Sequence, residues 1–334
     1  MCGDSLRGRF QSLSFHSPAW TRRLRSAAIT TALLGAAAAN AAAAQQRFGP
    51  SNLLSPVPIP SVRGAAAQAL AQAPLPAQVT PAATEPVSAY VPLRCVPTFG
   101  AGTAYDVCHL GAVHSRRLVV LLGDSHAWMW IPGFAAAAKE LGFDLVPLTK
   151  PGCAVWAVHV NRPGWPCLTW YRGVLRTIAR LRPSATVVSF MTSNFNLSQA
   201  SSAATYVQRV LDAVPHPVLL ADPPSDDWYT NTVPTPAQCM ATPGANQGTC
   251  ALRETAPIRA SLTQIQAMVN RDGYAAIPTL QWFCAAGTCP SVIDDTVTSE
   301  DGSHITAAYA KLLAPRLANQ LRPILRRLWR SEVA

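Results

Sequence analysis

The chain has 334 residues, of which 49% are hydrophobic and 13% are charged, so it can bury at least one sizeable core. Its formal net charge is +10, but eight of the basic residues lie in residues 1–94 and six between Lys311 and Arg330. A nucleic-acid-binding domain more often carries a basic stripe across its folded surface. The composition therefore argues against a nucleic-acid partner.

Residues 1–44 have the pattern of an export signal. Three arginines within residues 22–25 precede an apolar stretch at 27–39, and the alanine run at 41–44 offers a small-residue cleavage site. An uncleaved N-terminal anchor is the alternative, and we favour cleavage. The sequence predicts an exported protein, periplasmic or at the cell surface.

Residues 45–94 are rich in alanine and proline, with nine prolines between Pro50 and Pro92. Such a segment buries too little apolar surface to offset the entropy lost on ordering. We expect a disordered, extended linker here. The folded domain is expected to span residues 95–334.

From Leu118 onward, short apolar runs alternate with stretches of helical periodicity. We expect strands at residues 118–122, 143–148, 185–190, 218–221 and 274–280, and helices at 132–141, 168–181, 199–214, 253–271 and 306–320, the last kinked at Pro315. This alternation predicts a parallel sheet covered by helices on both faces, with ligands bound beyond the carboxyl ends of the strands.

The run Leu321–Arg330 alternates Leu, Ile and Trp with Arg. A helix end whose arginines complement the helix dipole is favoured over a basic amphipathic helix lying on an anionic membrane.

Nine cysteines are present, and Cys2 falls within the predicted signal. The remaining eight form neighbouring pairs along the chain: Cys95/Cys108, Cys153/Cys167, Cys239/Cys250 and Cys284/Cys289. Disulfides persist in oxidising compartments, and sequential pairing favours short loops. Zinc is the alternative at Cys284/Cys289, but no second close pair faces this one.

The first predicted strand is followed by Gly-Asp-Ser-His-Ala at residues 123–127. This places Ser125 at a strand-to-helix turn, where backbone N–H groups can stabilise an oxyanion. The alternative is that Asp124 and Ser125 only cap the helix.

The loop after the fifth predicted strand holds Asp301-Gly302-Ser303-His304. A serine nucleophile needs a base, and the base needs an acid that orients it. Asp301 and His304 have a spacing that suits this pair, unless Asp301 or Ser303 simply caps the last helix.

Gly-Asp-Ser near the start and Asp-x-x-His near the end resemble the first and last blocks of the SGNH hydrolase superfamily. Gly-Asp-Ser-His-Ala followed by Trp128 is most similar to SGNH domains fused to, or encoded beside, membrane acyltransferase-3 proteins, which O-acetylate envelope polysaccharides. The segments Thr149–Cys153 and Phe283–Pro290 resemble further parts of that group. The resemblance covers about residues 95–320.

The resemblance implies a three-layer α/β/α flavodoxin-like SGNH fold with a five-stranded parallel sheet, and an oxyanion hole of three donors. The implied residues are Ser125, Asp301 and His304 for the catalytic triad, and the backbone N–H groups of Ser125 and Gly152 with the Asn194 amide for the hole. The usual Gly-x-Asn block is absent, and Asn196 is the second choice. Gly152 has the alternative of an ordinary Pro-Gly turn.

The implied activity is that of an exported O-acyltransferase or esterase acting on short acyl groups of an envelope glycan through an acyl-Ser125 intermediate. A membrane acyltransferase is the implied acyl donor, and no metal or cofactor is expected. Acyl transfer to a sugar hydroxyl is preferred over hydrolysis.

Three other functions use some of the same residues. An α/β-hydrolase is rejected because the motif ends in Ala127 rather than glycine and the acid and base are neighbours. A metallophosphatase would need an Asp-x-His before Gly123, which is missing. A non-catalytic glycan-binding module is the main alternative. The candidate metal ligands of a metallophosphatase are Asp124, His126, Asp222 and His304. The candidate sugar-stacking residues of a glycan-binding module are Trp156, Trp165, Trp170 and Trp228.

Overall fold

The computed structural model describes residues 66–69, 75, 95, 100–192, 200–224, 235–253 and 256–331. The predicted export signal lies outside these residues, as does most of the predicted linker. Within the linker range, residues 66–69 form a helical turn in which Ala66 and Ala69 are buried. None of the helices within the described ranges is both long enough and apolar enough to cross a membrane.

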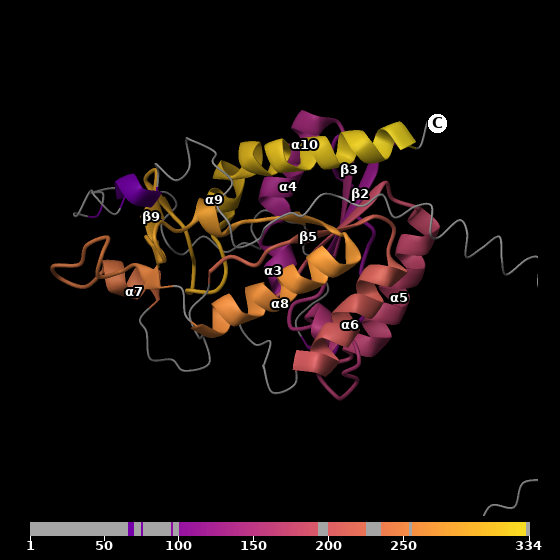
Figure 1. Ribbon diagram of the computed structural model, residues 1–334, viewed down its shortest axis with the longest axis horizontal. Helices are drawn as coiled ribbons and strands as arrows, with labels where there is room; N and C mark the ends of the chain where they lie inside the picture. The colour runs from indigo at the N-terminus through magenta and orange to yellow at the C-terminus, as the bar shows by residue number, and fades with distance from the viewer. Residues whose placement is uncertain are drawn as a thin grey trace, which may run out of the picture. The chain divides into compact units, whose positions relative to one another are not determined.

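A six-stranded sheet forms the centre of the fold, in the order β1-β3-β2-β4-β5-β7 (Figure 1). Its strands are β1 (Leu110–Gly111), β2 (Leu118–Gly123), β3 (Asp144–Thr149), β4 (Ala185–Ser189), β5 (Pro217–Leu220) and β7 (Ala275–Ile277). The last five are parallel, as predicted from the sequence. Taken in chain order their arrangement is 2-1-3-4-5, the flavodoxin-like order.

The predicted sheet of five strands was one strand short. β1 adds an antiparallel edge by pairing Leu110 with Leu145 and Gly111 with Asp144. Two residues carry no readable alternation of apolar and polar side chains, so the sequence pattern did not reveal this strand.

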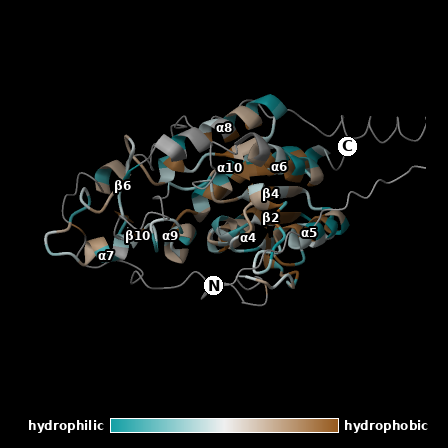
Figure 2. Cartoon of the chain, turned by 90° about the horizontal axis from the view of Figure 1, so that it is seen from below, coloured by the Kyte–Doolittle hydropathy of each residue, from teal (hydrophilic) through white to brown (hydrophobic). Residues whose placement is uncertain are grey.

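Each parallel strand is buried on both faces, which explains the continuous apolar runs in the sequence. In β2, Val119 and Leu121 belong to one hydrophobic cluster, and Val120 and Leu122 belong to the other. This follows from the alternation of side chains along a strand. Figure 2 shows the hydrophobic colouring concentrated on β2 and β4, between the helices.

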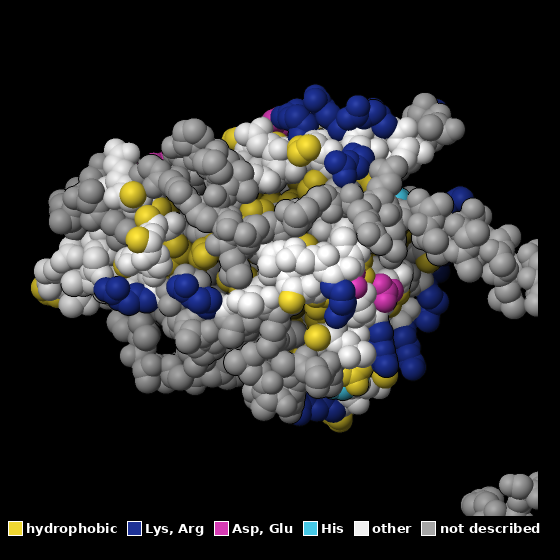
Figure 3. All heavy atoms as spheres, in the orientation of Figure 1, with side chains coloured by type: hydrophobic (Ala, Val, Ile, Leu, Met, Phe, Trp, Pro, Cys, Tyr) yellow, Lys and Arg dark blue, Asp and Glu magenta, His cyan; other side chains and the backbone are white. Residues whose placement is uncertain are grey.

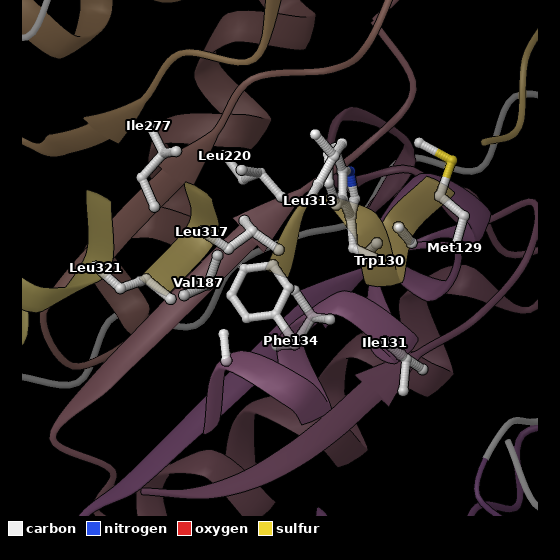
Figure 4. Close-up of a cluster of buried hydrophobic side chains, with 14 of the residues drawn as sticks. Met129, Trp130, Ile131, Phe134, Val187, Leu220, Ile277, Leu313, Leu317 and Leu321 are labelled. Atoms are coloured by element: carbon white, nitrogen blue, oxygen red, sulfur yellow. The ribbon is translucent and has the colours of Figure 1, made fainter. Parts of the chain in front are cut away.

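Two helix layers cover the sheet and complete the expected α/β/α architecture. One layer consists of α4 (Ile131–Leu141), α9 (Ala307–Leu312) and α10 (Ala314–Ser331), and the other of α5 (Cys167–Leu181), α6 (Ala200–Ala213) and α8 (Ala256–Asp272). In the first layer, Phe134 of α4 packs with Leu317 of α10 and Val187 of β4 (Figure 4).

The shorter elements lie outside the main sheet. They are α3 (Ser125–Trp128), α7 (Pro236–Met240), the pair β6 (Leu252–Arg253) and β8 (Thr288–Cys289), and the pair β9 (Val292–Ile293) and β10 (Thr296–Val297).

The single helix predicted for residues 306–320 is two helices. Pro315 has no N–H to donate to the carbonyl of Lys311, so α9 ends at Leu312 and α10 begins at Ala314 with proline in its first turn. The Arg-rich run after residue 320 belongs to α10, whose Leu325 and Leu328 are buried in the core. Its basic side chains gather on the outer surface (Figure 3).

Four disulfides join the eight cysteines of the domain, each between neighbours along the chain. The pairs are Cys95–Cys108, Cys153–Cys167, Cys239–Cys250 and Cys284–Cys289. The pairing that the sequence favoured is therefore the one the structure forms. Disulfides of this number indicate an exported protein.

We expect these eight cysteines to resist alkylation in the protein isolated without reductant, because a disulfide has no thiol to react. Mass spectrometry of peptides should show no adduct on any of the eight. The matched control is the same sample reduced and unfolded, in which all eight should be alkylated. Stoichiometric labelling of Cys284 and Cys289 before reduction would contradict their pairing.

Candidate active site

The candidate nucleophile lies at the turn that leaves β2. Gly123 is the last residue of the strand, and a Cβ added to it would lie 1.8 Å from the carbonyl oxygen of Ser189 in β4. Glycine is therefore needed for the two strands to approach closely at this point. Ser125 follows as the first residue of α3 and is half-buried.

Asp124 fixes this turn and joins it to a neighbouring loop. Its side chain accepts a hydrogen bond from the His126 N–H at 2.8 Å and from the Met191 N–H at 3.1 Å. Burial raises the pKa of Asp124, against the opposing effect of His126 and of these N–H donors. Asp124 therefore caps α3, and its bond to the Met191 N–H also connects the end of β2 to the segment after β4.

Asp301 and His304 form a hydrogen-bonded pair on the loop before α9. The Asp301 Oδ2 to His304 Nδ1 distance is 2.8 Å, and Asp301 Oδ1 accepts the N–H groups of Ser303 and His304 at 2.8 and 2.7 Å. Burial opposes ionisation of Asp301, but the bonds from His304 and Ser303 outweigh it and lower the pKa to about 2. Asp301 is a carboxylate throughout the neutral range.

This pair does not cap the last helices. Thr306 is the N-cap of α9, and its side chain accepts the N–H of Tyr309. The alternative role of Asp301 or Ser303 as that cap is therefore wrong. Asp301 and His304 precede the helix. The Nδ1 of His304 faces Asp301, so its Nε2 is the nitrogen that can act as the base.

The base loop lies against the nucleophile turn. The ring centroids of His304 and His126 are 4.9 Å apart, and His126 directly follows Ser125 in the chain. In the described residues no hydrogen bond joins Ser125 Oγ to His304. In unliganded enzymes such bonds are often long and tighten when substrate binds. The structure thus brings together the two loops that carry the three residues of the expected triad.

A buried His–Asp pair lies beside the site, and the sequence suggested its two residues only as metal ligands of the metallophosphatase alternative. The His126 Nδ1 lies 2.5 Å from Asp222 Oδ1, and both side chains are buried. Burial alone would lower the pKa of His126, but the Asp222 carboxylate and its hydrogen bond outweigh this and raise the pKa to about 9. Asp222 follows β5 at the same sheet edge, which is the sequence signal that could have identified it.

This pair predicts a stability that depends on pH. A histidine whose pKa rises from 6.5 to about 9 on folding stabilises the protein fully below 6.5 and loses that effect as the pH rises through 9. The shift corresponds to a contribution on the order of 3 kcal/mol. We expect the free energy of unfolding, measured with urea, to fall between pH 6.5 and pH 10.

The control for this prediction is Asp222→Asn, which keeps the shape of the side chain and removes its charge. In this variant the decline between pH 6.5 and pH 10 should be much smaller. Equal declines in the variant and the parent protein would show that His126 does not carry the effect.

The residues considered for a metal site have other partners. Asp124 accepts backbone N–H groups, His126 contacts Asp222 and Ser303 through its two nitrogens, and His304 Nδ1 faces Asp301. Across the described ranges, no group of three or more His, Cys, Asp or Glu side chains is arranged to hold a metal ion.

Two of the expected oxyanion donors lie at adjacent positions of the sheet edge. Gly123 of β2 pairs with Thr149 of β3, and the Lys150 N–H donates to the Gly123 carbonyl at 2.9 Å. The turn that holds Gly152 follows directly. Among the described residues, the backbone N–H of Ser125 and that of Gly152 have no protein acceptor.

Two further features hold the Gly152 turn in place. The buried Lys150 Nζ donates to the carbonyls of Gly100 and Gly102 at 3.0 and 2.6 Å. Gly152 has φ +79°, and a Cβ there would lie 2.2 Å from the Trp165 ring. The third expected donor, Asn194, and its alternative Asn196 lie outside the described residues.

Gly152→Ala keeps the backbone N–H, but the added methyl group must displace Trp165 or shift the turn that carries this N–H, and alanine at this φ adds about 1–2 kcal/mol of strain. We therefore expect kcat to fall by up to about 10²-fold, the usual loss for one oxyanion donor. The measurement is steady-state turnover of a chromogenic acetyl ester.

Gly164→Ala is the matched control, because Gly164 has φ +81° and open space where a Cβ would stand. It should carry the same backbone strain and retain near-normal kcat. Equal losses of kcat in the two variants would remove Gly152 from the oxyanion hole.

The parallel sheet carries a serine after its first parallel strand and a hydrogen-bonded Asp–His pair before the last helices, which are the residue types that serine hydrolases and acyltransferases use. The sequence model of one family, described as the SGNH domain (fused to AT3 domains), matches residues 94–319. The chain belongs to this family, as its sequence motifs indicated.

Comparison with solved structures gives distant similarities. The periplasmic domain of a lipopolysaccharide acetyltransferase from Salmonella ser. Paratyphi A is 13% identical with a TM-score of 0.49, over 63% of this chain and 86% of that one. A peptidoglycan O-acetylesterase is 12% identical with a TM-score of 0.35, over 56% and 48% of the two chains. The chain has no match among curated protein sequences.

Proposed function

We propose that this protein is an exported serine enzyme that moves an acetyl or other short acyl group to or from hydroxyls of a cell-envelope glycan. The observation that carries the proposal is the Asp301–His304 pair, 2.8 Å between Oδ2 and Nδ1, on a loop packed against the Ser125 turn. This is the acid–base pair that a serine nucleophile requires.

The chemistry proceeds in two halves. Ser125 Oγ attacks the carbonyl carbon of an acyl ester while His304 Nε2 takes its proton. The oxyanion that develops is stabilised by the N–H groups of Ser125 and Gly152. The alcohol then leaves with the proton held by His304, and acyl-Ser125 remains.

In the second half, water or a sugar hydroxyl gives its proton to His304 and attacks acyl-Ser125. The bond between the acyl carbon and Ser125 Oγ then breaks, and His304 returns the proton to Oγ, which restores the free serine. Water makes the protein an esterase, and a sugar hydroxyl makes it an O-acyltransferase. We favour transfer, with a membrane acyltransferase as the acyl donor, because the family's domains occur fused to AT3 domains.

Aromatic side chains near the site support a sugar substrate. Trp165 packs against Gly152, and the Trp156 indole N–H donates to the Met191 carbonyl, so both stand at the catalytic edge half-buried. Indole faces stack on sugar rings by burying apolar area. Trp170 instead belongs to the core, and Trp228 lies outside the described residues.

The test incubates the purified full chain with a chromogenic acetyl ester, with and without candidate envelope glycans. Ester turnover together with an acetylated sugar detected by mass spectrometry supports acyl transfer. Turnover without acetylated sugar supports the esterase. Glycan binding without any turnover would favour the non-catalytic binding module and overturn the proposal.

A further inference from the structure

His126 is buried with both ring nitrogens in use, although the chemistry above assigns it no step. Its side chain has no exposed area. Nδ1 faces Asp222 at 2.5 Å, and Nε2 lies 3.1 Å from the hydroxyl of Ser303. The imidazole therefore connects the turn after β2, the end of β5 and the loop before α9.

Ser303 is the contact of most consequence, because it stands between the acid and the base. Its backbone N–H donates to Asp301 at 2.8 Å, and the next residue is His304. A shift of Ser303 would therefore move both Asp301 and His304. Holding Ser303 against a residue adjacent to Ser125 fixes the distance between nucleophile and base.

We propose that His126 is a positioning residue, which holds the Asp301–His304 loop in register with the Ser125 turn through its hydrogen bond to Ser303. The proposal rests on the proposed function, since it concerns the geometry of the same site. His126 itself touches no reacting atom.

The charges around His126 favour this role. Asp222, Asp124 and Asp301 all surround it, and with its pKa near 9 the ring is protonated at neutral pH. Both nitrogens then carry a proton, so Nε2–H donates to Ser303 Oγ. Hydrogen bonds from a charged donor are shorter and stronger than neutral ones, which suits a fixed register.

Asp222, on the other side of the His126 ring from Ser303, is also held by hydrogen bonds. Asp222 Oδ2 accepts the N–H and the hydroxyl of Thr192 at 2.8 and 3.1 Å. A buried ion pair is often no more stabilising than apolar residues of equal volume. Besides its pH-dependent contribution to stability, the pair fixes the orientation of the ring.

The variants separate the two contacts of the ring. In His126→Gln the amide nitrogen takes the position of Nε2 and can still reach Ser303, whereas in His126→Asn it takes that of Nδ1 and cannot. Ser303→Ala removes the contact from the other side. Ser184→Ala is the matched control, since Ser184 is also buried but sits at the opposite end of the sheet, with its N–H on the Leu118 carbonyl.

With a chromogenic acetyl ester as substrate, Ser303→Ala should lower kcat about tenfold, the loss expected for one hydrogen bond, and leave KM within about twofold. His126→Asn should lose at least as much, and His126→Gln should retain more kcat than His126→Asn. The double variant His126→Asn/Ser303→Ala should have the same kcat as His126→Asn, because both changes remove the same hydrogen bond. Ser303→Ala with the kcat of Ser184→Ala, or additive losses in the double variant, would overturn the proposal.

A second measurement needs no turnover, so failure of the proposed function can be told apart from failure of this inference. Hydrogen exchange followed by mass spectrometry should show faster exchange in the peptide covering residues 299–305 in Ser303→Ala and His126→Asn, and near-parent exchange in His126→Gln. An inactive parent protein with this exchange pattern would refute the enzyme but keep the positioning role. Unchanged exchange in all variants would refute the positioning role.

Discussion

The Ser125→Ala variant is expected to lose turnover of an acetyl ester by about 10⁴-fold or more while keeping its fold, the scale seen when a serine nucleophile is removed. Ser125 starts α3 beyond the carboxyl end of β2, half-buried, on the turn that faces the His304 loop. Its side chain takes part in no hydrogen bond within the described residues, so alanine should cost little stability. The measurements are kcat/KM and the melting temperature.

Ser115→Ala is the matched control, because Ser115 is half-buried too but lies before β2, with its hydroxyl donating to the Gly142 carbonyl. It should turn over the ester like the parent protein. A fluorophosphonate reagent should label the peptide containing Ser125 in the parent and nothing in Ser125→Ala. Labelling of another serine, or a variant with near-parent turnover, would refute the nucleophile.

The parts of the candidate site that could be predicted are those that depend on residues close together in the sequence. The apolar run that ends in Gly-Asp-Ser predicts a buried strand and the turn after it, and Asp301 precedes His304 by three residues. Both lie where the sequence placed them, because local spacing and the rule for parallel sheets suffice.

The sequence places Asp222 at the same sheet edge as the nucleophile turn, but its hydrogen bond to His126 could not be predicted, because that contact depends on which strands are neighbours. His126 and Asp222 are 96 residues apart, and they meet because β4 alone separates β2 from β5 in the sheet. Several orders of five parallel strands are compatible with the same sequence pattern. The order found places a single strand between β2 and β5, which brings the end of β5 close enough to reach the nucleophile turn.

Element ends were misjudged where side chains bind the backbone. The fifth strand was predicted for residues 274–280, but β7 stops at Ile277. The hydroxyl of Thr279 donates to the carbonyls of Ala221 and Asp222, and the chain then enters a 3₁₀ turn at Leu280–Trp282. Hydrophobicity alone does not show such a competing bond.

The second large effect is expected from Asp301→Asn. Asp301 Oδ2 accepts from His304 Nδ1 at 2.8 Å, so the carboxylate keeps the proton on Nδ1 and leaves Nε2 as the base. An asparagine can turn its NH₂ group toward Nδ1 and favour the opposite tautomer, and the equivalent change in a serine protease costs about 10⁴-fold in kcat. We expect a loss of that order in kcat, with KM little changed.

The structure also supplies a strict comparison for this variant. Asp295, exposed in the turn between β9 and β10 at φ +54°, can be replaced by asparagine without strain, since asparagine adopts this conformation readily. Asp295→Asn should therefore match the parent protein in kcat and melting temperature. Because Asp301 also accepts two backbone N–H groups, Asp301→Asn should melt somewhat lower than the parent, so kcat is to be measured well below its melting temperature. If folded Asp301→Asn then retains more than about a tenth of the parent kcat, Asp301 does not orient the base, and His304 would need a different partner in the reaction.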